Sequence, residues 1–186
     1  NAAKKLNKKA NISIRVNPNV DPKTHPYIST GLKKNKFGVD EKNAILMYKI
    51  AKKLDSINIK GIDCHIGSQI TELKPFEDSI KKLMELVNHL KSIDIFIKHI
   101  DIGGGIGIKY SKEEPPTFSD YAKTVKNILK DTDLKIIFEP GRALIGKAGV
   151  LLTEVEFIKN GPEKNFVIVN AAMNDLMRPT LYDAFH

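Results

Sequence analysis

Short apolar segments alternate with longer amphipathic segments along most of the chain. The apolar segments are nearly continuous and bounded by Gly, Pro or polar residues, which is typical of buried strands. They lie at residues 12–17, 57–66, 97–102 and 134–139. The amphipathic segments have apolar side chains at helical spacing, and they lie at residues 40–54, 75–90 and 119–130. Pro75, and the pair Ser119 and Asp120, mark helix starts. This βαβαβαβ order predicts an α/β fold in which helices cover a parallel sheet.

The pattern changes beyond Arg142. Residues 148–160 and 165–170 are strand-like, and the turn signal NGPEKN joins them without an intervening helix. We therefore expect one domain over residues 1–145 and the start of a β-rich domain over residues 146–186. Because the chain begins without Met and stops directly after a motif-like stretch, we expect an internal segment of a longer polypeptide.

Composition narrows the possible partners. The chain has 186 residues, of which 41% are hydrophobic, and its formal net charge is +8. The lysines are dispersed and arginine is rare, which favours a solvated surface over a nucleic-acid interface. No apolar run reaches the roughly 18 residues of a membrane span. The single cysteine, Cys64, excludes an intramolecular disulfide framework and is compatible with a reducing compartment, so we expect a cytoplasmic protein.

Chemically active or unusual residues lie at the carboxyl ends of four successive predicted strands, or in the turns just beyond. They are Arg15, His65 with Ser68, the glycines Gly103, Gly104 and Gly105, and Glu139 with Arg142. In a parallel β/α barrel, catalytic groups converge at the carboxyl ends of the strands. Four such stretches at one rim predict a functional site there.

Each stretch also has a purely structural interpretation. His65 alone would more often be a hydrogen-bonded structural residue. The glycines would form a flexible turn, and their spacing is not that of a dinucleotide-binding loop. Pro140 and Gly141 are a common turn pair, which would leave Glu139 and Arg142 solvated. Because a lone buried carboxylate is costly, however, we expect Glu139 to lie inside the rim with a charged partner.

Pyridoxal phosphate fits this combination of groups. Glycine N–H groups bind phosphate, a carboxylate pairs with the protonated pyridine nitrogen, and an imidazole stacks on the ring. A sugar phosphate or a nucleotide would fit the glycine loop but would leave the carboxylate and the imidazole less explained.

Five motifs, in their order and spacing, resemble those of the diaminopimelate decarboxylase family, pyridoxal-phosphate enzymes of the alanine-racemase-like barrel class. The motifs are TGLKKNKFG, CHIGSQI, IDIGGGIGI, EPGRALIGKAG and AAMNDLMRPTLYDAFH. The resemblance covers almost the whole chain. It implies the second half of a (β/α)8 TIM-type barrel followed by the start of a β-rich domain. The implied reaction is decarboxylation of the amino acid meso-2,6-diaminopimelate to L-lysine, the last step of lysine biosynthesis.

The resemblance also implies residue roles. His65 would stack on the cofactor ring and Glu139 would face the pyridine nitrogen, so both are expected to be catalytic. The implied cofactor-binding residues are His65, Ser68, Gly103, Gly104, Gly105, Glu139, Pro140, Gly141 and Arg142. The implied substrate-binding residues are Arg142, Arg178 and Tyr182, and no metal ion is expected. A helical turn over RPTLY would place Arg178 and Tyr182 on one face, where a guanidinium suits a substrate with two carboxylates.

Part of the family's site is expected outside this chain. The resemblance implies a Schiff-base lysine upstream of Asn1. It also implies a cysteine and a tyrosine beyond His186, in a homodimer whose partner contributes to the site. Neither Lys109 nor Lys147 matches the lysine motif, and Cys64 is not the family's catalytic cysteine.

The substrate and the activity each have competing interpretations. A related barrel decarboxylase acting on ornithine, arginine or carboxynorspermidine would share the cofactor motifs, and Arg178 is the feature that discriminates. A non-catalytic pyridoxal-phosphate-binding protein, or a phosphate-binding barrel enzyme that uses no pyridoxal phosphate, would also fit the glycine loop. Without the resemblance, a structural salt bridge for Arg178 and core packing for Tyr182 would be the more common arrangement. Asn170 and Ala172 replace the family's usual Asp and Gly, so we expect a local change near that turn.

Overall fold

The computed structural model describes residues 1–21 and 36–186, so most of the motif at residues 30–38 lies outside the described residues. Four parallel strands form one sheet in the order β1-β2-β3-β4. The strands are β1 (Ala10–Arg15), β2 (Ile57–Asp63), β3 (His99–Asp101) and β4 (Lys135–Ile137). The connecting helices are α2 (Glu41–Lys52), α3 (Lys74–Ser92) and α4 (Phe118–Leu129). The α/β class, the parallel sheet and the βαβαβαβ order are therefore confirmed.

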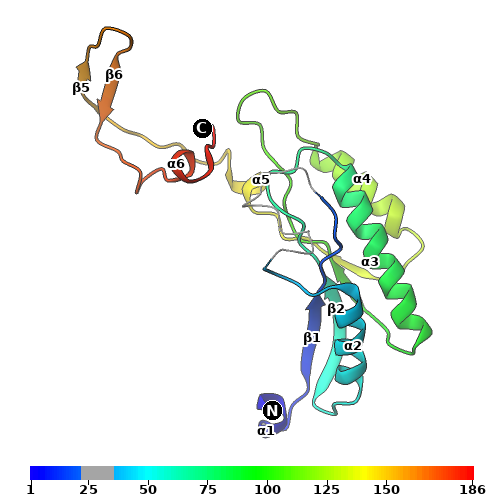
Figure 1. The fold of residues 1–186 in the computed structure, drawn as a ribbon. Coiled ribbons are helices and arrows are strands. Elements are labelled where there is room, and N and C mark those ends of the chain that lie inside the picture. The colour runs from blue at the N-terminus through cyan, green and yellow to red at the C-terminus, as the bar shows by residue number, and fades with distance from the viewer. Residues whose placement is uncertain (22–35) are drawn as a thin grey trace.

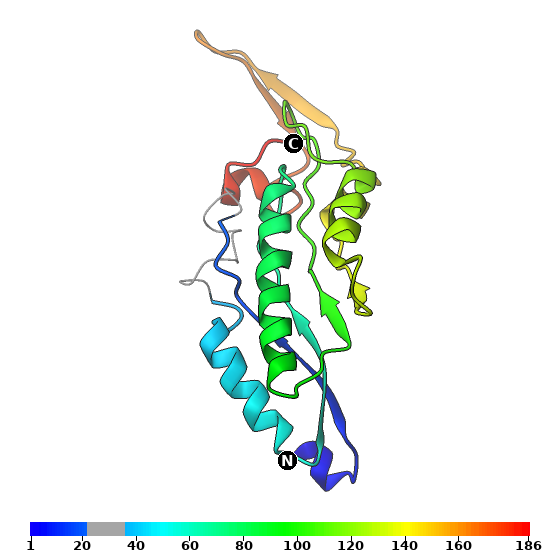
Figure 2. The same cartoon turned by 90° about the vertical axis from the view of Figure 1, so that its right-hand side faces the viewer.

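All three connecting helices lie on the same face of the sheet (Figures 1 and 2). The apolar core fills the space between them, with Ile62 and Ile100 fully buried on the strands and Leu83 nearly so on α3. Tyr48 of α2 anchors this packing, because its buried hydroxyl donates a 2.7 Å hydrogen bond to the carbonyl of Gly61. The opposite face of the sheet has no helix from the described part of this chain on it.

The prediction of nearly continuous apolar strands is wrong in detail. Successive side chains of a strand point to opposite faces. The open side therefore has a polar residue at the end of β1, β2 and β3, whereas Ile137 takes the equivalent position on β4. The parallel register pairs Arg15 with Asp63, and Asp63 with Asp101. These half-buried ionisable side chains form one layer across three neighbouring strands. Strands β3 and β4 are also shorter than predicted.

Side-chain caps set the helix starts. Asp40 precedes α2 and accepts a 2.9 Å hydrogen bond from the N–H of Asn43, which satisfies one of the helix's unpaired donors. The start predicted for α4 at Ser119 is wrong by one residue. Thr117 is the capping residue there, and its hydroxyl accepts from the N–H of Asp120 at 3.1 Å. Pro75 lies in the first turn of α3, as predicted.

The last part of the chain is an antiparallel hairpin with short helices on either side. Strands β5 (Val155–Lys159) and β6 (Phe166–Val169) pair with each other and project away from the sheet (Figure 1). The strand predicted at residues 148–160 is thus shorter, beginning at Val155. The remaining helices are α1 (Ala2–Lys5), α5 (Arg142–Ile145) and α6 (Arg178–Tyr182).

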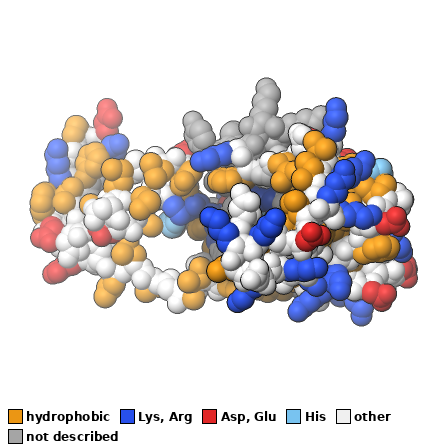
Figure 3. All heavy atoms as spheres, turned by 90° about the horizontal axis from the view of Figure 1, so that it is seen from below, with side chains coloured by type: hydrophobic (Ala, Val, Ile, Leu, Met, Phe, Trp, Pro, Cys, Tyr) orange, Lys and Arg blue, Asp and Glu red, His pale blue; other side chains and the backbone are white. Residues whose placement is uncertain are grey.

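Charged side chains of both signs lie on the face of the molecule that is seen from below (Figure 3). In the view from below, lysine and arginine side chains are interspersed with acidic and apolar ones (Figure 3). Among the described residues, no helix is both long and apolar enough to cross a membrane.

Gly61 provides a test of the sheet packing. A Cβ built at this position would lie 1.9 Å from Nε2 of His99, its register partner on β3. We expect Gly61→Ala to lower the free energy of unfolding by about 1–3 kcal/mol, the usual cost of overpacking. Urea denaturation measures this change. His99→Ala should recover most of the loss in the double variant, and additive effects would contradict the predicted collision.

Candidate active site

The loops that follow the four strands are hydrogen-bonded to one another. The N–H of Gly104 donates to Nδ1 of His65 at 3.2 Å, and the N–H of Glu139 donates to the carbonyl of Gly103 at 2.9 Å. The Arg15 guanidinium donates to the carbonyl of His65 at 3.5 Å. The structure therefore brings the four sequence-predicted stretches together at the carboxyl end of the sheet.

The three consecutive glycines are required by close backbone packing. Gly103 and Gly105 have φ values of +68° and +111°, which L side chains rarely adopt. A Cβ at Gly104 would lie 2.1 Å from the carbonyl oxygen of Glu139, and one at Gly103 would lie 2.5 Å from that of Cys64. A side chain at Gly103 or Gly104 would separate the strand ends, so this loop is a packed junction and not merely a flexible turn.

Two N–H groups of the glycine loop already have partners within the protein. The N–H of Gly103 donates to the Asp101 carboxylate at 2.9 Å, and that of Gly104 donates to His65. In the described part of the chain, the N–H of Gly105 has no backbone acceptor. An incoming phosphate would therefore meet fewer free donors than the sequence suggested.

His65 is held as a neutral imidazole. Burial lowers its pKa below the usual 6.5, the nearby charge of Arg15 lowers it further, and Asp101 partly opposes this. Because Nδ1 accepts the Gly104 N–H, the proton of the neutral ring is on Nε2. The ring is half-buried at the end of β2.

Sequence reasoning missed two carboxylates, Asp63 and Asp101. Asp63 accepts a 2.9 Å hydrogen bond from the hydroxyl of Ser13, and Asp101 fixes the start of the glycine loop. Burial raises the pKa of Asp63, and the neighbouring Asp101 raises it further. The signal was present in the sequence, because Asp63 follows Ile62 and Asp101 follows Ile100 at the ends of two predicted strands.

Glu139 lies at the expected end of the sheet, but it is exposed and not enclosed within the rim. Partial burial raises the pKa of its carboxyl, and the carboxylates of Asp101 and Asp63 raise it further, while Arg15 lowers it. A protonated ring nitrogen beside Glu139 would favour the ionised carboxylate. The expectation that Glu139 lies inside the rim with a charged partner stays a prediction, because no other described element covers the open face here.

The chain has three arginines: Arg15 ends β1, Arg142 begins α5 and Arg178 begins α6. Burial lowers the pKa of Arg142, and the charge of Arg178 lowers it further. The Nε atom of Arg178 is buried and has no hydrogen-bond partner among the described residues. Its guanidinium lies 5.4 Å from the centre of the Tyr182 ring, so the predicted helical turn does place these two side chains together.

Gln69 is a third residue that sequence reasoning missed. Its amide oxygen accepts a 3.1 Å hydrogen bond from Nη1 of Arg142, which lies 73 residues further along the chain. By contrast, the neighbouring Ser68 is half-buried, and its hydroxyl has no hydrogen bond within the described residues. Pro140 and Gly141 are exposed directly before α5. The structure therefore places them beside Arg142 but shows no contact that defines their roles.

The cysteine and the two lysines that do not match the family's catalytic residues lie at a buried strand end and in exposed loops. Cys64 is buried, and burial raises the pKa of its thiol to about 12, which leaves it protonated and unreactive. Lys109 and Lys147 are both exposed in loops.

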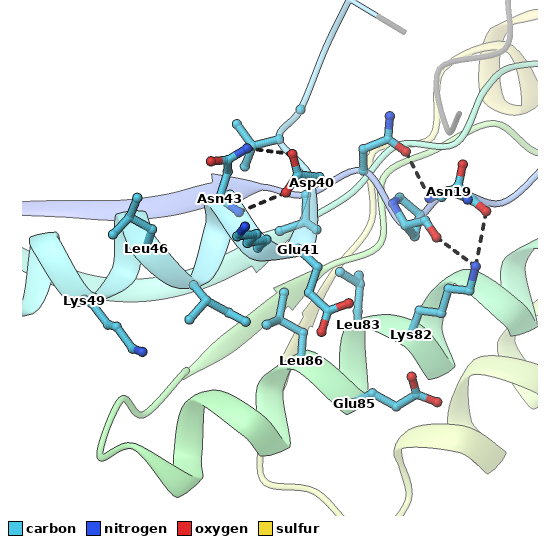
Figure 4. A pocket seen from close by; sticks show the side chains of 17 residues that line it. Asn19, Asp40, Glu41, Asn43, Leu46, Lys49, Lys82, Leu83, Glu85 and Leu86 are labelled. Carbon is cyan, nitrogen blue, oxygen red and sulfur yellow. Dashed lines mark hydrogen bonds between the residues drawn. The ribbon is translucent and has the colours of Figure 1, made fainter. Parts of the chain in front are cut away.

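A large groove of about 1220 Å³ lies elsewhere, between α2 and α3 (Figure 4). Lys82 borders it and donates to the carbonyls of Pro18 and Asn19 at 3.0 and 3.2 Å. The groove is on the helix side of the sheet and has none of the sequence-predicted site residues in its lining. The candidate site is therefore the strand-end cluster.

Comparison with known proteins gives one consistent family. Residues 1–146 match the family model of the pyridoxal-dependent decarboxylase, pyridoxal binding domain. The diaminopimelate decarboxylase of Neisseria meningitidis serogroup A is 53% identical over 184 residues, which are 99% of this chain and 45% of the relative. That of Aquifex aeolicus is 51% identical over 185 residues, which are 99% of this chain and 44% of the relative.

A solved structure agrees with these relatives. The crystal structure of diaminopimelate decarboxylase from Helicobacter pylori complexed with L-lysine has a TM-score of 0.95 and 47% identity, covering 99% of this chain and 46% of that chain. This chain thus spans less than half the length of the relatives it matches. The match over residues 1–146 shows that the chain belongs to the pyridoxal-dependent decarboxylase family.

Proposed function

We propose that this chain forms part of the active site of a decarboxylase that converts meso-2,6-diaminopimelate to L-lysine with pyridoxal phosphate. The relatives named diaminopimelate decarboxylase, and the L-lysine in the Helicobacter pylori structure, support this substrate. The observation that carries the proposal is the proximity of Arg142 and Arg178. Within the described residues neither guanidinium has an acidic partner, so an anion between them would relieve their repulsion.

The residues around this pair fit pyridoxal phosphate. The buried Nε of Arg178 and the N–H of Gly105, both without a partner in the described ranges, are donors for anionic groups. Glu139 is a hydrogen-bond acceptor. Its pKa is raised here, and a cation beside it would lower that pKa again. The bound cofactor supplies a cationic conjugated ring that takes up the electron pair released when the Cα–carboxylate bond breaks.

His65 is proposed to stack on the cofactor ring. A neutral imidazole can face a cationic ring without charge repulsion, and the lowered pKa of His65 keeps it neutral near pH 7. The Gly104 N–H holds Nδ1 and so fixes the orientation of the ring. Glu139 is proposed to accept a hydrogen bond from the protonated ring nitrogen, which keeps the electron sink charged.

The anionic ends of the cofactor and the substrate are assigned to the glycine-containing loops and the arginines. Gly105, Gly141 and Arg142 are proposed to contact the phosphate, together with Gly103, Gly104, Ser68 and Pro140 in the same loops. Arg142, Arg178 and Tyr182 are proposed to bind the substrate. A substrate with a second, distal carboxylate would use the guanidinium of Arg178, whereas ornithine lacks that group.

We infer that the four strands are the second half of an eight-stranded β/α barrel, with a β-rich domain starting near residue 146. Both β1 and β4 are edges of the present sheet, and one face is free of described helices, as half of a barrel would be. The family match ends at residue 146, which supports the division. The Schiff-base lysine is then supplied by the part of the polypeptide outside this chain.

A homodimer in the cytoplasm, with a site completed by the partner subunit, is the proposed assembly. The β5–β6 hairpin supports an interface, because Phe157 and Val167 are 60% and 58% exposed on strands that no other described element covers. The amino-acid substrate is the only small-molecule partner that the proposal requires besides the cofactor.

Arg178 tests the substrate assignment. In the whole decarboxylase, we expect Arg178→Ala to lower kcat/KM for meso-diaminopimelate roughly 10- to 100-fold, because a hydrogen bond to a charged group contributes about 1.5–3 kcal/mol. Carbon dioxide release, with and without added pyridoxal phosphate, measures it. Lys147→Ala, which removes an exposed charge nearby, is the matched control. Release from ornithine or arginine but not from diaminopimelate would overturn the substrate.

Glu139 tests the cofactor orientation. We expect Glu139→Gln to lower kcat roughly 10- to 100-fold, since a neutral amide holds the ring nitrogen's proton less strongly than a carboxylate. The visible absorbance of bound cofactor should persist, so binding and chemistry are separated. A variant with unchanged kcat would remove Glu139 from its proposed role.

The protonation state of His65 can be measured directly. NMR titration should show its imidazole titrating below pH 6.5, because burial and Arg15 disfavour the charged form. The folded state then binds fewer protons than the unfolded state. The stability that neutral His65 contributes is therefore present above pH 6.5 and is lost as the pH falls through the lowered pKa. His65→Gln should flatten this acid loss of stability, and titration at or above pH 6.5 would contradict the assignment.

A further inference from the structure

We propose that Gln69 is a positioning residue that aims the Arg142 guanidinium at an anionic group while leaving its charge intact. The inference rests on the proposed function, because it concerns the same site. It assigns a role to a residue that lies in the motif CHIGSQI but was given no role there.

The Gln69 side chain makes three hydrogen bonds. Its Nε2 donates to the carbonyl of Ile108 at 2.6 Å, and its Oε1 accepts from the N–H of Ile108 at 3.1 Å. The same oxygen accepts from Nη1 of Arg142 at 3.1 Å. The amide is thereby fixed by both backbone groups of one residue, and its remaining acceptor site points at the arginine.

The surrounding backbone makes this amide rigid. The N–H of Ile70 donates to the carbonyl of Gly105 and the N–H of Gly107 donates to the carbonyl of Ile70, both at 2.9 Å. An isolated parallel bridge pairs Ile70 with Ile106. The loop that carries Gln69 is therefore joined to the segment after the glycines, and Gln69 extends this junction to α5 through Arg142.

The backbone of Gln69 indicates that its side chain is needed. Its φ is +57°, in the left-handed region that glycine adopts freely and glutamine does not. A glycine would fit this conformation without strain, yet it would lose all three side-chain hydrogen bonds. The side chain therefore does something that the conformation alone does not require.

The neutral charge of the amide explains why a glutamine suits this place. A carboxylate in contact with Arg142 would pair with it and compete with any anionic ligand. An amide oxygen orients one of the five guanidinium donors and leaves the others, with the full positive charge, for the ligand. The anion is either the cofactor phosphate or a substrate carboxylate, which share this chemistry.

The test is a double-mutant cycle in the whole decarboxylase. Gln69→Glu adds the competing charge, and Gln69→Gly removes the side chain while keeping a backbone-compatible residue. Each is combined with Arg142→Lys. Asn127→Asp on the exposed face of α4 is the matched amide-to-acid control. Calorimetry measures the Kd of pyridoxal phosphate and of meso-diaminopimelate, and steady-state assays measure KM and kcat.

We expect Gln69→Glu to weaken binding of one of these two anions about tenfold or more, with kcat changed by less than threefold. In the Arg142→Lys background the same substitution should have little further effect. The Kd that responds identifies the anion as phosphate or carboxylate. Unchanged Kd values, or effects that simply add to those of Arg142→Lys, would overturn the inference.

The two proposals can fail separately. If no substrate releases carbon dioxide but the cofactor Kd still shows coupling between Gln69 and Arg142, the proposed reaction is wrong and the positioning role stands. If decarboxylation proceeds with additive effects at the two residues, the reaction stands and Gln69 has only a structural role.

Discussion

The parallel register of four strands is the constraint on which the rest of the site depends. Parallel strands end at the same edge, so the loops that follow them are neighbours whatever their separation in sequence. The register also places Arg15, Asp63 and Asp101 in one layer on the open face. The helices complete this arrangement by burying the isoleucines on the opposite face, which leaves the polar residues only one direction to point.

Backbone contact at the strand ends makes the arrangement precise. Gly104 approaches the carbonyl of Glu139 so closely that a side chain would collide with it, and its N–H donates to Nδ1 of His65. The glycine loop is thus first a junction between strands and only secondly a place for a ligand. This explains how a loop with three glycines can hold an imidazole in one orientation.

Charge at the site is balanced across a short distance. Carboxylates gather on β2 and β3, where Asp101 raises the pKa of Asp63, whereas Arg142 and Arg178 gather near α5 and α6 with no described acid between them. A bound molecule with a cationic ring and anionic ends matches this separation. The neutral amide of Gln69 is consistent with the same separation, because it orients the Arg142 guanidinium without neutralising its positive charge.

The sequence by itself determined the order of strands and helices, the change of pattern after Arg142 and the family motifs, because periodicity and motif residues are local properties of the chain. It also predicted that His65, the glycines and Glu139 would meet, since parallel strands share an edge. It could not show which face each polar strand residue would take, or that Glu139 would be exposed. Those features, and the contact between Gln69 and Arg142, were decided by tertiary structure, because they depend on register and on packing between segments up to 73 residues apart.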